Sequence, residues 1–263
     1  MKYIKLYFKY AKLSIMSKLS YKSNTIIGIS AFLLNEIVSV ATLYLLVSNV
    51  NAVGGWSIYQ IGFLYGLVNL AIGFDHLFTD RLWTVAYWEV RKGKLDSVFL
   101  RPLPTLFQII ASEIQLEAFG EIFTAIVLLI YTSFNINFSV NALNIILLIV
   151  GIIGASICIT SFKIIISSFA FRIKTSGPIL QIVYNFTQFG KYPLHIYPKF
   201  IEIILCCVVP IGLCVYYPAL NIMTNQNNPW AVGGVILLAC TLFFIISIFI
   251  RNFNARKYES TGS

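Results

Sequence analysis

Three glutamates, Glu113, Glu117 and Glu121, are spaced four residues apart in an apolar part of the sequence. Side chains with this spacing lie on one face of a helix, so a helix over 106–134 would carry them as one acidic stripe. A carboxylate within a bilayer is costly and is normally paired, protonated or turned toward water. The stripe predicts either a proton relay or an ionic contact between helices. The ionic contact is favoured because the glutamates lie near an expected cytoplasmic boundary.

The stripe has two candidate partners of opposite charge. One is Lys163, and the other is the lysine-rich segment at the start of the chain. Glu36 and Asp75 are the other acidic residues expected at membrane depth.

Composition indicates that lipid is part of the solvent for this chain. It has 263 residues, of which 58% are hydrophobic and only 11% are charged. One soluble core cannot bury that much apolar surface. Segments near or above the length of about 20 residues that crosses a bilayer predict an all-α polytopic membrane protein with six transmembrane helices. The expected spans are 25–47, 58–79, 106–134, 141–170, part of 177–217, and 231–250.

The distribution of Lys and Arg predicts the orientation. Basic residues cluster before the first span, between spans two and three, after span four and at the C-terminal end, whereas the loops 48–57 and 135–141 have none. Because basic loops stay in the cytoplasm, both termini are expected there. The net charge of +9 fits this topology and attraction to membrane lipid. No nucleic-acid-binding motif accompanies it, so nucleic acid is not an expected partner.

The expected organisation has three parts. Residues 1–22 form an amphipathic interfacial (elbow) helix, with lysines on one face and apolar side chains on another. Residues 23–250 form the transmembrane domain, and 251–263 form a cytoplasmic tail.

The loop 80–105 combines charges of both signs with large apolar side chains and ends in Arg101-Pro102-Leu103-Pro104. This pattern predicts a short helix that docks on a soluble protein and is stopped by proline. An interfacial connector without a partner is the alternative. The residues expected to make the contact are Trp88, Glu89, Arg91, Lys94, Leu95, Asp96, Leu100 and Arg101.

The segment 177–220 holds five of the eight prolines and is not expected to form continuous helices. Its two apolar pieces cannot both cross, because the C-terminal basic residues would then lie outside. One piece is therefore expected to be re-entrant or interfacial, and the region is a candidate gate or pathway wall. A kinked packing helix is the alternative. The candidate gate residues are Tyr184, Phe186, Phe189, Tyr192, Pro193, Tyr197, Pro198 and Pro210.

No catalytic constellation is recognisable, and the chain has no GxxxxGK[ST] phosphate loop. It is therefore not expected to be an enzyme, and any energy source should lie on another chain. The five cysteines form no CxxC pair and predict no metal site.

Several segments together resemble the small ABC-2 type permeases of bacterial ABC exporters. The best of them is the run Gly93-Lys94-Leu95-Asp96-Ser97-Val98-Phe99-Leu100-Arg101-Pro102-Leu103, between spans two and three. The others are Tyr192-Pro193-Leu194-His195-Ile196-Tyr197-Pro198, Val209-Pro210 and Tyr217-Pro218-Ala219, and the resemblance covers nearly the whole chain.

This resemblance implies a half-transporter of the type V exporter kind in the bacterial plasma membrane. Two permease chains, identical or paralogous, would join an ABC ATPase dimer that holds ATP and Mg, so this chain would need no cofactor. The loop helix would be the coupling helix, and 177–220 would form the extracellular gate. The aromatic content of 15% fits an amphipathic or hydrophobic substrate such as a drug, lipid or small peptide. The alternatives are a proton-coupled secondary transporter, a membrane enzyme, or a membrane-embedded immunity protein.

Overall fold

The fold is known from a computed structural model that describes residues 2–48, 53–136, 141–224 and 228–259. Parts of the predicted loops 48–57 and 135–141, and residues 260–263 of the predicted tail, lie outside these ranges. Within them the chain is helical, and an isolated bridge joins Val53 to Trp56. The all-α prediction is confirmed for this part of the chain.

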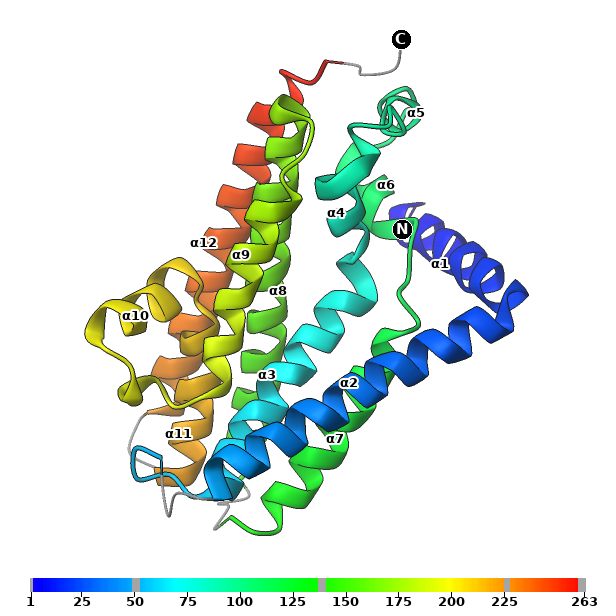
Figure 1. The fold of residues 1–263 in the computed structure, drawn as a ribbon. Helices are drawn as coiled ribbons and strands as arrows, with labels where there is room; N and C mark the ends of the chain where they lie inside the picture. The colour runs from blue at the N-terminus through cyan, green and yellow to red at the C-terminus, as the bar shows by residue number, and fades with distance from the viewer. Residues whose placement is uncertain (1, 49–52, 137–140, 225–227, 260–263) are drawn as a thin grey trace.

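The N-terminal half contains a long buried helix, α3, a longer and mostly exposed helix, α2, and several shorter elements (Figure 1). Its α-helices are α1 (Lys2–Ser20), α2 (Lys22–Ser48), α3 (Ile58–Thr79), α4 (Arg81–Thr84), α5 (Asp96–Phe99), α6 (Thr105–Ala111) and α7 (Ala118–Ser133), and η1 (Val85–Glu89) is a π-helix.

The C-terminal half contains two long α-helices with an irregular segment between them. The α-helices are α8 (Ala142–Ile173), α9 (Gly177–Thr187), α10 (Lys199–Ile203), α11 (Tyr217–Thr224) and α12 (Pro229–Ala255). The 3₁₀-helices are η2 (Gln188–Lys191) and η3 (Leu194–Ile196), and the π-helices are η4 (Ile204–Val208) and η5 (Gly212–Tyr216).

Helix α3 is the centre of the fold. In its most apolar window 83% of the residues are buried within the chain, against 11% for α2 and 17% for α12. It packs on α7 and α8, and α8 packs along α12. Figure 1 shows α2 diverging from the other helices, with the end of α12 and α5 at one end of the molecule and the start of α3 at the other. The outer helices therefore leave large apolar surfaces for lipid or for another chain.

The ends of the long helices follow local sequence signals. Ser57 and Gln60 form a capping box that begins α3. Asn228 caps α12, whose first residue is Pro229, where the missing N–H needs no partner. Lys174 ends α8 with a left-handed backbone, φ 67°.

The predicted single helix over 106–134 is wrong. Residues 112–117 are not helical and separate α6 from α7. The break is stabilised from outside, because Gln115 N–H donates to the Leu77 carbonyl at 3.0 Å and Ile114 N–H donates to Ser14 Oγ at 2.9 Å. These bonds replace helical ones, so the interruption leaves no unpaired donor at either position.

Length and composition identify the helices that can cross a membrane. Among the described residues, four helices are long and apolar enough to cross a membrane: α2, α3, α8 and α12. A bent pair, Lys199–Val208 with Gly212–Thr224, brings the number to five if it is one span. Helix α7 has 16 residues and is shorter than the about 20 that a full crossing needs.

The predicted interruption within 177–220 is present. The two limbs of the bent pair meet at 88°, and Pro210 lies between them. Proline has no N–H to donate and its ring obstructs a continuous helix, which explains the position of the bend. The π-helices η4 and η5 lie within the two limbs, and the 3₁₀-helices η2 and η3 precede the first limb.

The second limb packs on α8 through a glycine, and this contact can be tested. A Cβ at Gly151 would lie too close to the Cys214 carbonyl oxygen, whereas a Cβ at Gly234 on α12 would meet nothing within 4 Å. Gly151→Ala is expected to destabilise the protein by about 1–3 kcal/mol through overpacking. Gly234→Ala is expected to be neutral or stabilising, because alanine favours helix. Thermal unfolding of the detergent-purified variants measures the difference, and equal midpoints would contradict this packing.

Candidate functional site

An ion pair between Asp75 of α3 and Lys163 of α8 lies in the interior of the helix bundle. Lys163 Nζ is 2.6 Å from Asp75 Oδ2, and the two side chains are 1% and 0% exposed. The hydroxyls of Thr79 and Thr160 donate to Asp75 Oδ1 at 2.7 and 2.8 Å. Lys163 is also 3.5 Å from Asp80 Oδ1. The carboxylate and ammonium therefore have the partners that buried charges require.

His76 follows Asp75 on α3 and contacts side chains of two other helices. Its Nδ1 lies 2.8 Å from Glu121 Oε2 of α7, and its Nε2 lies 3.1 Å from the hydroxyl of Tyr184 on α9. The His76 and Tyr184 rings stack with centroids 5.6 Å apart. Both partners are far from His76 in the sequence, at separations of 45 and 108 residues, so no local sequence signal identifies this contact.

Two further buried polar contacts extend this region. Asn69 of α3 donates from Nδ2 to Glu36 Oε2 of α2. Lys191 Nζ lies 4.4 Å from the centroid of the Tyr65 ring and 3.4 Å from its hydroxyl. The face of α3 toward α2, α8 and α9 therefore carries polar groups along much of its length.

The predicted acidic stripe is not one surface. Glu117 lies 2.7 Å from Lys18 Nζ and Glu113 lies 4.0 Å from it, whereas Glu121 pairs with His76. The physical reason is the break before α7, which removes the helical register between Glu113 and Glu121. Of the two predicted partners the N-terminal helix is confirmed, and Lys163 pairs with Asp75 and Asp80 instead.

A small polar cavity of about 220 Å³ adjoins the buried charges. Four of its six lining residues carry aromatic rings, and the Trp83 and Tyr184 rings meet edge to face at 5.3 Å. The Asp80 side chain is 26% exposed and is the acidic group of the cavity. The lining residues are Phe32, His76, Asp80, Trp83, Gln181 and Tyr184.

Of the predicted gate residues, Tyr184 lines this cavity and the others do not. Phe186, Tyr192 and Tyr197 pack against the main hydrophobic core, and Phe189 is 40% exposed. Pro193 and Pro210 are buried, whereas Pro198 is exposed. The irregular segment between α9 and α11 distributes these residues over several surfaces, so they do not form one pathway wall within a single chain.

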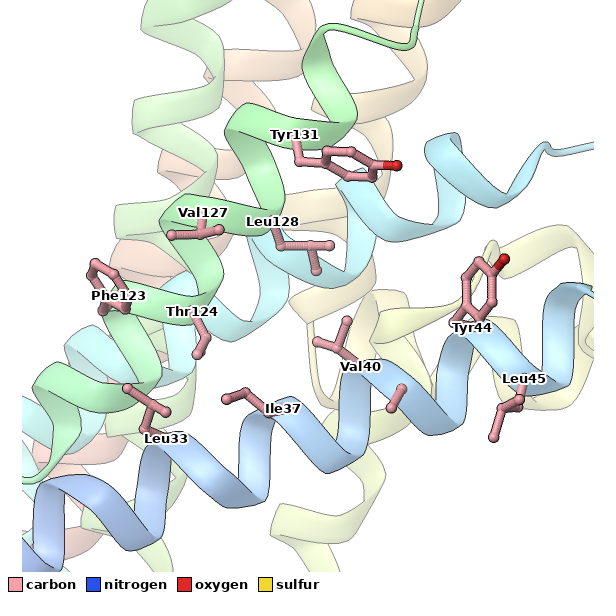
Figure 2. Close-up of a pocket in the computed structure, with 11 residues that line it drawn as sticks. Leu33, Ile37, Val40, Tyr44, Leu45, Phe123, Thr124, Val127, Leu128 and Tyr131 are labelled. Carbon is pink, nitrogen blue, oxygen red and sulfur yellow. The ribbon is translucent and has the colours of Figure 1, made fainter.

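An apolar groove of about 650 Å³ runs between α2 and α7. Figure 2 shows Leu33, Ile37 and Val40 on α2 facing Thr124 and Leu128 on α7. Tyr44, Thr124 and Tyr131 carry the hydroxyl groups among its lining residues. Its two walls are about 90 residues apart in the sequence, which is why no sequence pattern identified it.

The loop between α3 and α6 has a buried side and an exposed side. Leu95 is 0% exposed and packs with Phe171 and Ile164 of α8. This corrects the prediction that Leu95 contacts a partner directly, because its side chain is already covered. Glu89 is similarly turned inward and pairs with Arg81 at 3.2 Å.

Asp96 is half-buried and holds the C-terminal tail. The Tyr258 hydroxyl donates to Asp96 Oδ1 at 2.7 Å, and the rings of Tyr258 and Phe99 stack at 4.6 Å. Burial raises the pKa of the Tyr258 phenol, and the bond to Asp96 and its charge raise it further. The hydroxyl therefore stays protonated at neutral pH and can act as donor.

The exposed side retains most of the predicted docking residues. Leu100 is 85% exposed and Trp88 is 45% exposed. Arg91, Lys94 and Arg101 are also exposed. Large apolar groups among cations therefore face outward on a loop whose inner side is fixed to α8.

A comparison with protein-family models matches residues 33–262 to the ABC-2 family transporter proteins. The chain belongs to this family. It is thus a membrane permease of an ABC transporter, and the family implies association with an ABC ATPase in general terms. A search of curated protein sequences finds no significant match.

The buried ion pair of this ABC-2 permease predicts an unequal response to single and double substitution. Lys163→Met leaves the Asp75 carboxylate without its counter-charge and is expected to cost about 3–5 kcal/mol. Adding Asp75→Asn removes the unpaired charge and should recover most of this loss. Thermal unfolding in detergent measures both, with the exposed Lys92→Met as the matched control. A single variant as stable as the control would contradict the assigned pair.

Proposed function

We propose that this chain is half of the pathway of an ATP-driven exporter for amphipathic or hydrophobic molecules, coupled to a separate ABC ATPase. The observation that carries the proposal is the family match over 33–262, combined with an exposed apolar and basic loop between α3 and α6. ATP and Mg would bind to the partner ATPase. The functional unit would contain two permease chains, identical or paralogous.

The exposed side of the loop is the proposed ATPase contact. Leu100 would be the central apolar anchor, and Trp88, Arg91, Lys94 and Arg101 would surround it. Aromatic residues and arginine are common in interface centres, and truncation of such anchors is costly. The contact of Leu95 and Phe99 with α8, and that of Asp96 with Tyr258, would carry movement of the loop into the bundle. Closure of the ATPase dimer would then shift the permease halves as rigid bodies.

The topology proposed for this function has six crossings and both termini in the cytoplasm of a bacterial cell. Helix α1 would lie in the interface, because it exposes Ile4, Phe8 and Leu13. The broken segment 177–220 would contribute one crossing and the extracellular gate. Support comes from the 88° bend and from basic residues gathered in the loops assigned to one side.

Two cavities support an amphipathic substrate. The groove between α2 and α7 has an almost wholly apolar lining and would admit a hydrophobic body from the bilayer. The smaller cavity at Asp80 offers a carboxylate beside the Trp83 and Tyr184 rings, an arrangement that favours a positively charged group. The formal charges of the neighbouring Asp75, Asp80 and Lys163 sum to −1, which also favours a positively charged substrate.

A proton-coupled carrier is the second candidate, and the buried contacts of Glu36 and Glu121 favour it. The two functions differ in their energy source. Export that stops when the Walker lysine of the cognate ATPase is replaced, and persists when the proton gradient is collapsed, supports the exporter. The opposite result would support the carrier.

The docking loop is tested by placing a charge at its exposed apolar centre. Leu100→Glu is expected to abolish co-purification of the ATPase from mild detergent, because an acidic group replaces the buried anchor of the interface. Phe134→Glu is the matched control, since Phe134 is 84% exposed at the end of α7 away from the loop. Equal recovery of the ATPase with both variants would refute this assignment of the loop.

The cavity is tested by neutralising its carboxylate. Asp80→Asn is expected to weaken export of a lipophilic dye cation such as ethidium by about 10- to 100-fold, the range for loss of a charged contact of about 1.5–3 kcal/mol. Export of a neutral dye, Nile red, should change little. The exposed Glu259→Gln serves as the control for altered net charge. Equal effects on the two dyes would exclude recognition of a cation by Asp80.

A further inference from the structure

Three cysteine sulfurs converge inside the C-terminal half of the bundle. Cys158 lies on α8, Cys214 on η5 and Cys240 on α12. The Sγ of Cys240 is 3.6 Å from that of Cys158 and 3.6 Å from that of Cys214, and all three sulfurs lie within 4.8 Å of one another. Their exposures are 0%, 0% and 2%, so the cluster is closed to solvent and lipid.

The packing around the cluster brings the three elements unusually close. Gly154 lies one turn before Cys158, and a Cβ there would come within 2.9 Å of Cys240 Sγ and 3.5 Å of Cys214 Sγ. The Cys240 thiol donates to the Gly154 carbonyl at 3.3 Å. A Cβ at this position would also lie 2.8 Å from Ile236 Cγ2, so the glycine allows both the close packing of α8 on α12 and the approach of the sulfurs.

The sulfur geometry matches a metal–thiolate site. With metal–sulfur bonds of about 2.3 Å, three sulfurs around one ion are separated by about 4 Å, close to the spacing present here. Structural zinc sites almost always use four ligands. Among the residues that the structure describes, this cluster contains three potential ligands, all of them cysteines. Thiolates select soft ions such as Cu(I). Three converging sulfurs in an apolar setting therefore favour a monovalent, thiophilic ion.

We propose that Cys158, Cys214 and Cys240 bind one Cu(I)-class ion. One S–H bond breaks as the sulfur–ion bond forms, its proton passes to the buffer with the entry of the ion, the other two thiols coordinate through sulfur lone pairs, and no electron is transferred. A monovalent ion with one thiolate gives a neutral site, which suits an interior where a net charge is costly. The bound ion links three elements: η5, which belongs to the second limb of the broken segment, and the helices α8 and α12.

Occupancy of the site restrains the broken segment. The limb containing η5 contacts α8 along its length, as the approach of Gly151 to the Cys214 carbonyl shows. An ion shared by three elements opposes any separation of this limb from α8 and α12. This effect concerns the stability of the chain itself, so it can be measured without a transport substrate or an ATPase.

The experiment uses the full-length chain purified in detergent under anaerobic, thiol-free conditions. Ag(I) serves as a redox-inert probe and Cu(I) is tested in parallel against a chromogenic chelator. The variants are Cys158→Ser and Cys240→Ser, and the control is Cys206→Ser/Cys207→Ser, which removes two cysteines outside the cluster. Bound metal per chain, X-ray absorption and thermal unfolding are recorded, and each variant must remain monodisperse without metal.

The expected result is one ion per chain with sulfur-only coordination at about 2.3 Å and a raised unfolding midpoint. Cys158→Ser and Cys240→Ser should weaken binding by more than the about 10- to 100-fold that follows loss of a residue hydrogen-bonded to a metal ligand. The control should bind like the parent. Binding that disappears only in the control would place the metal on Cys206 or Cys207 and overturn the proposal. So would absence of bound metal, or a disulfide between two of the three cysteines in the purified chain.

If the serine variants are not monodisperse, Gly154→Ala provides a second test. The added methyl group displaces the sulfurs while retaining all five thiols. Weaker binding with an unchanged thiol count supports a site with defined geometry. Unchanged binding by Gly154→Ala would mean that the ion does not occupy the cluster.

Discussion

The contact between Asp75 and Lys163 constrains the arrangement of the bundle. A buried charge without a partner is prohibitively costly in a low-dielectric interior, so α3 and α8 must keep their relative height and rotation for the pair to form. Thr79 and Thr160 complete the bonds of the carboxylate and tighten this requirement. The apolar contacts around α3 provide most of the buried surface, but such contacts are non-directional and tolerate sliding. The ion pair fixes the register.

The same region links the interior to the loop between α3 and α6. Asp80 follows the last residue of α3 and lies beside both Lys163 and the polar cavity. The loop itself is fixed to α8 by Leu95 and Phe99. Helix α8 thus meets the buried charges and the loop, and it also packs along α12. A rigid helix in this position can transmit a displacement from one end of the molecule to the other, since packed helices move as units.

The interruptions in α6–α7 and in 177–220 have different causes. At 112–117 the helix is replaced by bonds to Leu77 and Ser14 and by the contacts of Lys18 with Glu113 and Glu117. These partners come from distant parts of the chain. At Val209-Pro210 the cause is local, because proline cannot continue the hydrogen-bond ladder. The local interruption was predictable from the sequence, and the one that depends on distant partners was not.

The sequence alone determined the helical class, the positions of α2, α3, α8 and α12, the broken segment and the family resemblance. These follow from apolar length, proline position and motif order, which are local properties. Tertiary structure decided which ionisable groups meet: Glu121 with His76, Lys163 with Asp75, and three cysteines from separate elements. It also decided that Leu95 faces inward while Leu100 faces outward. Such contacts depend on the relative rotation and height of helices far apart in the sequence, and a single helix carries no information about either.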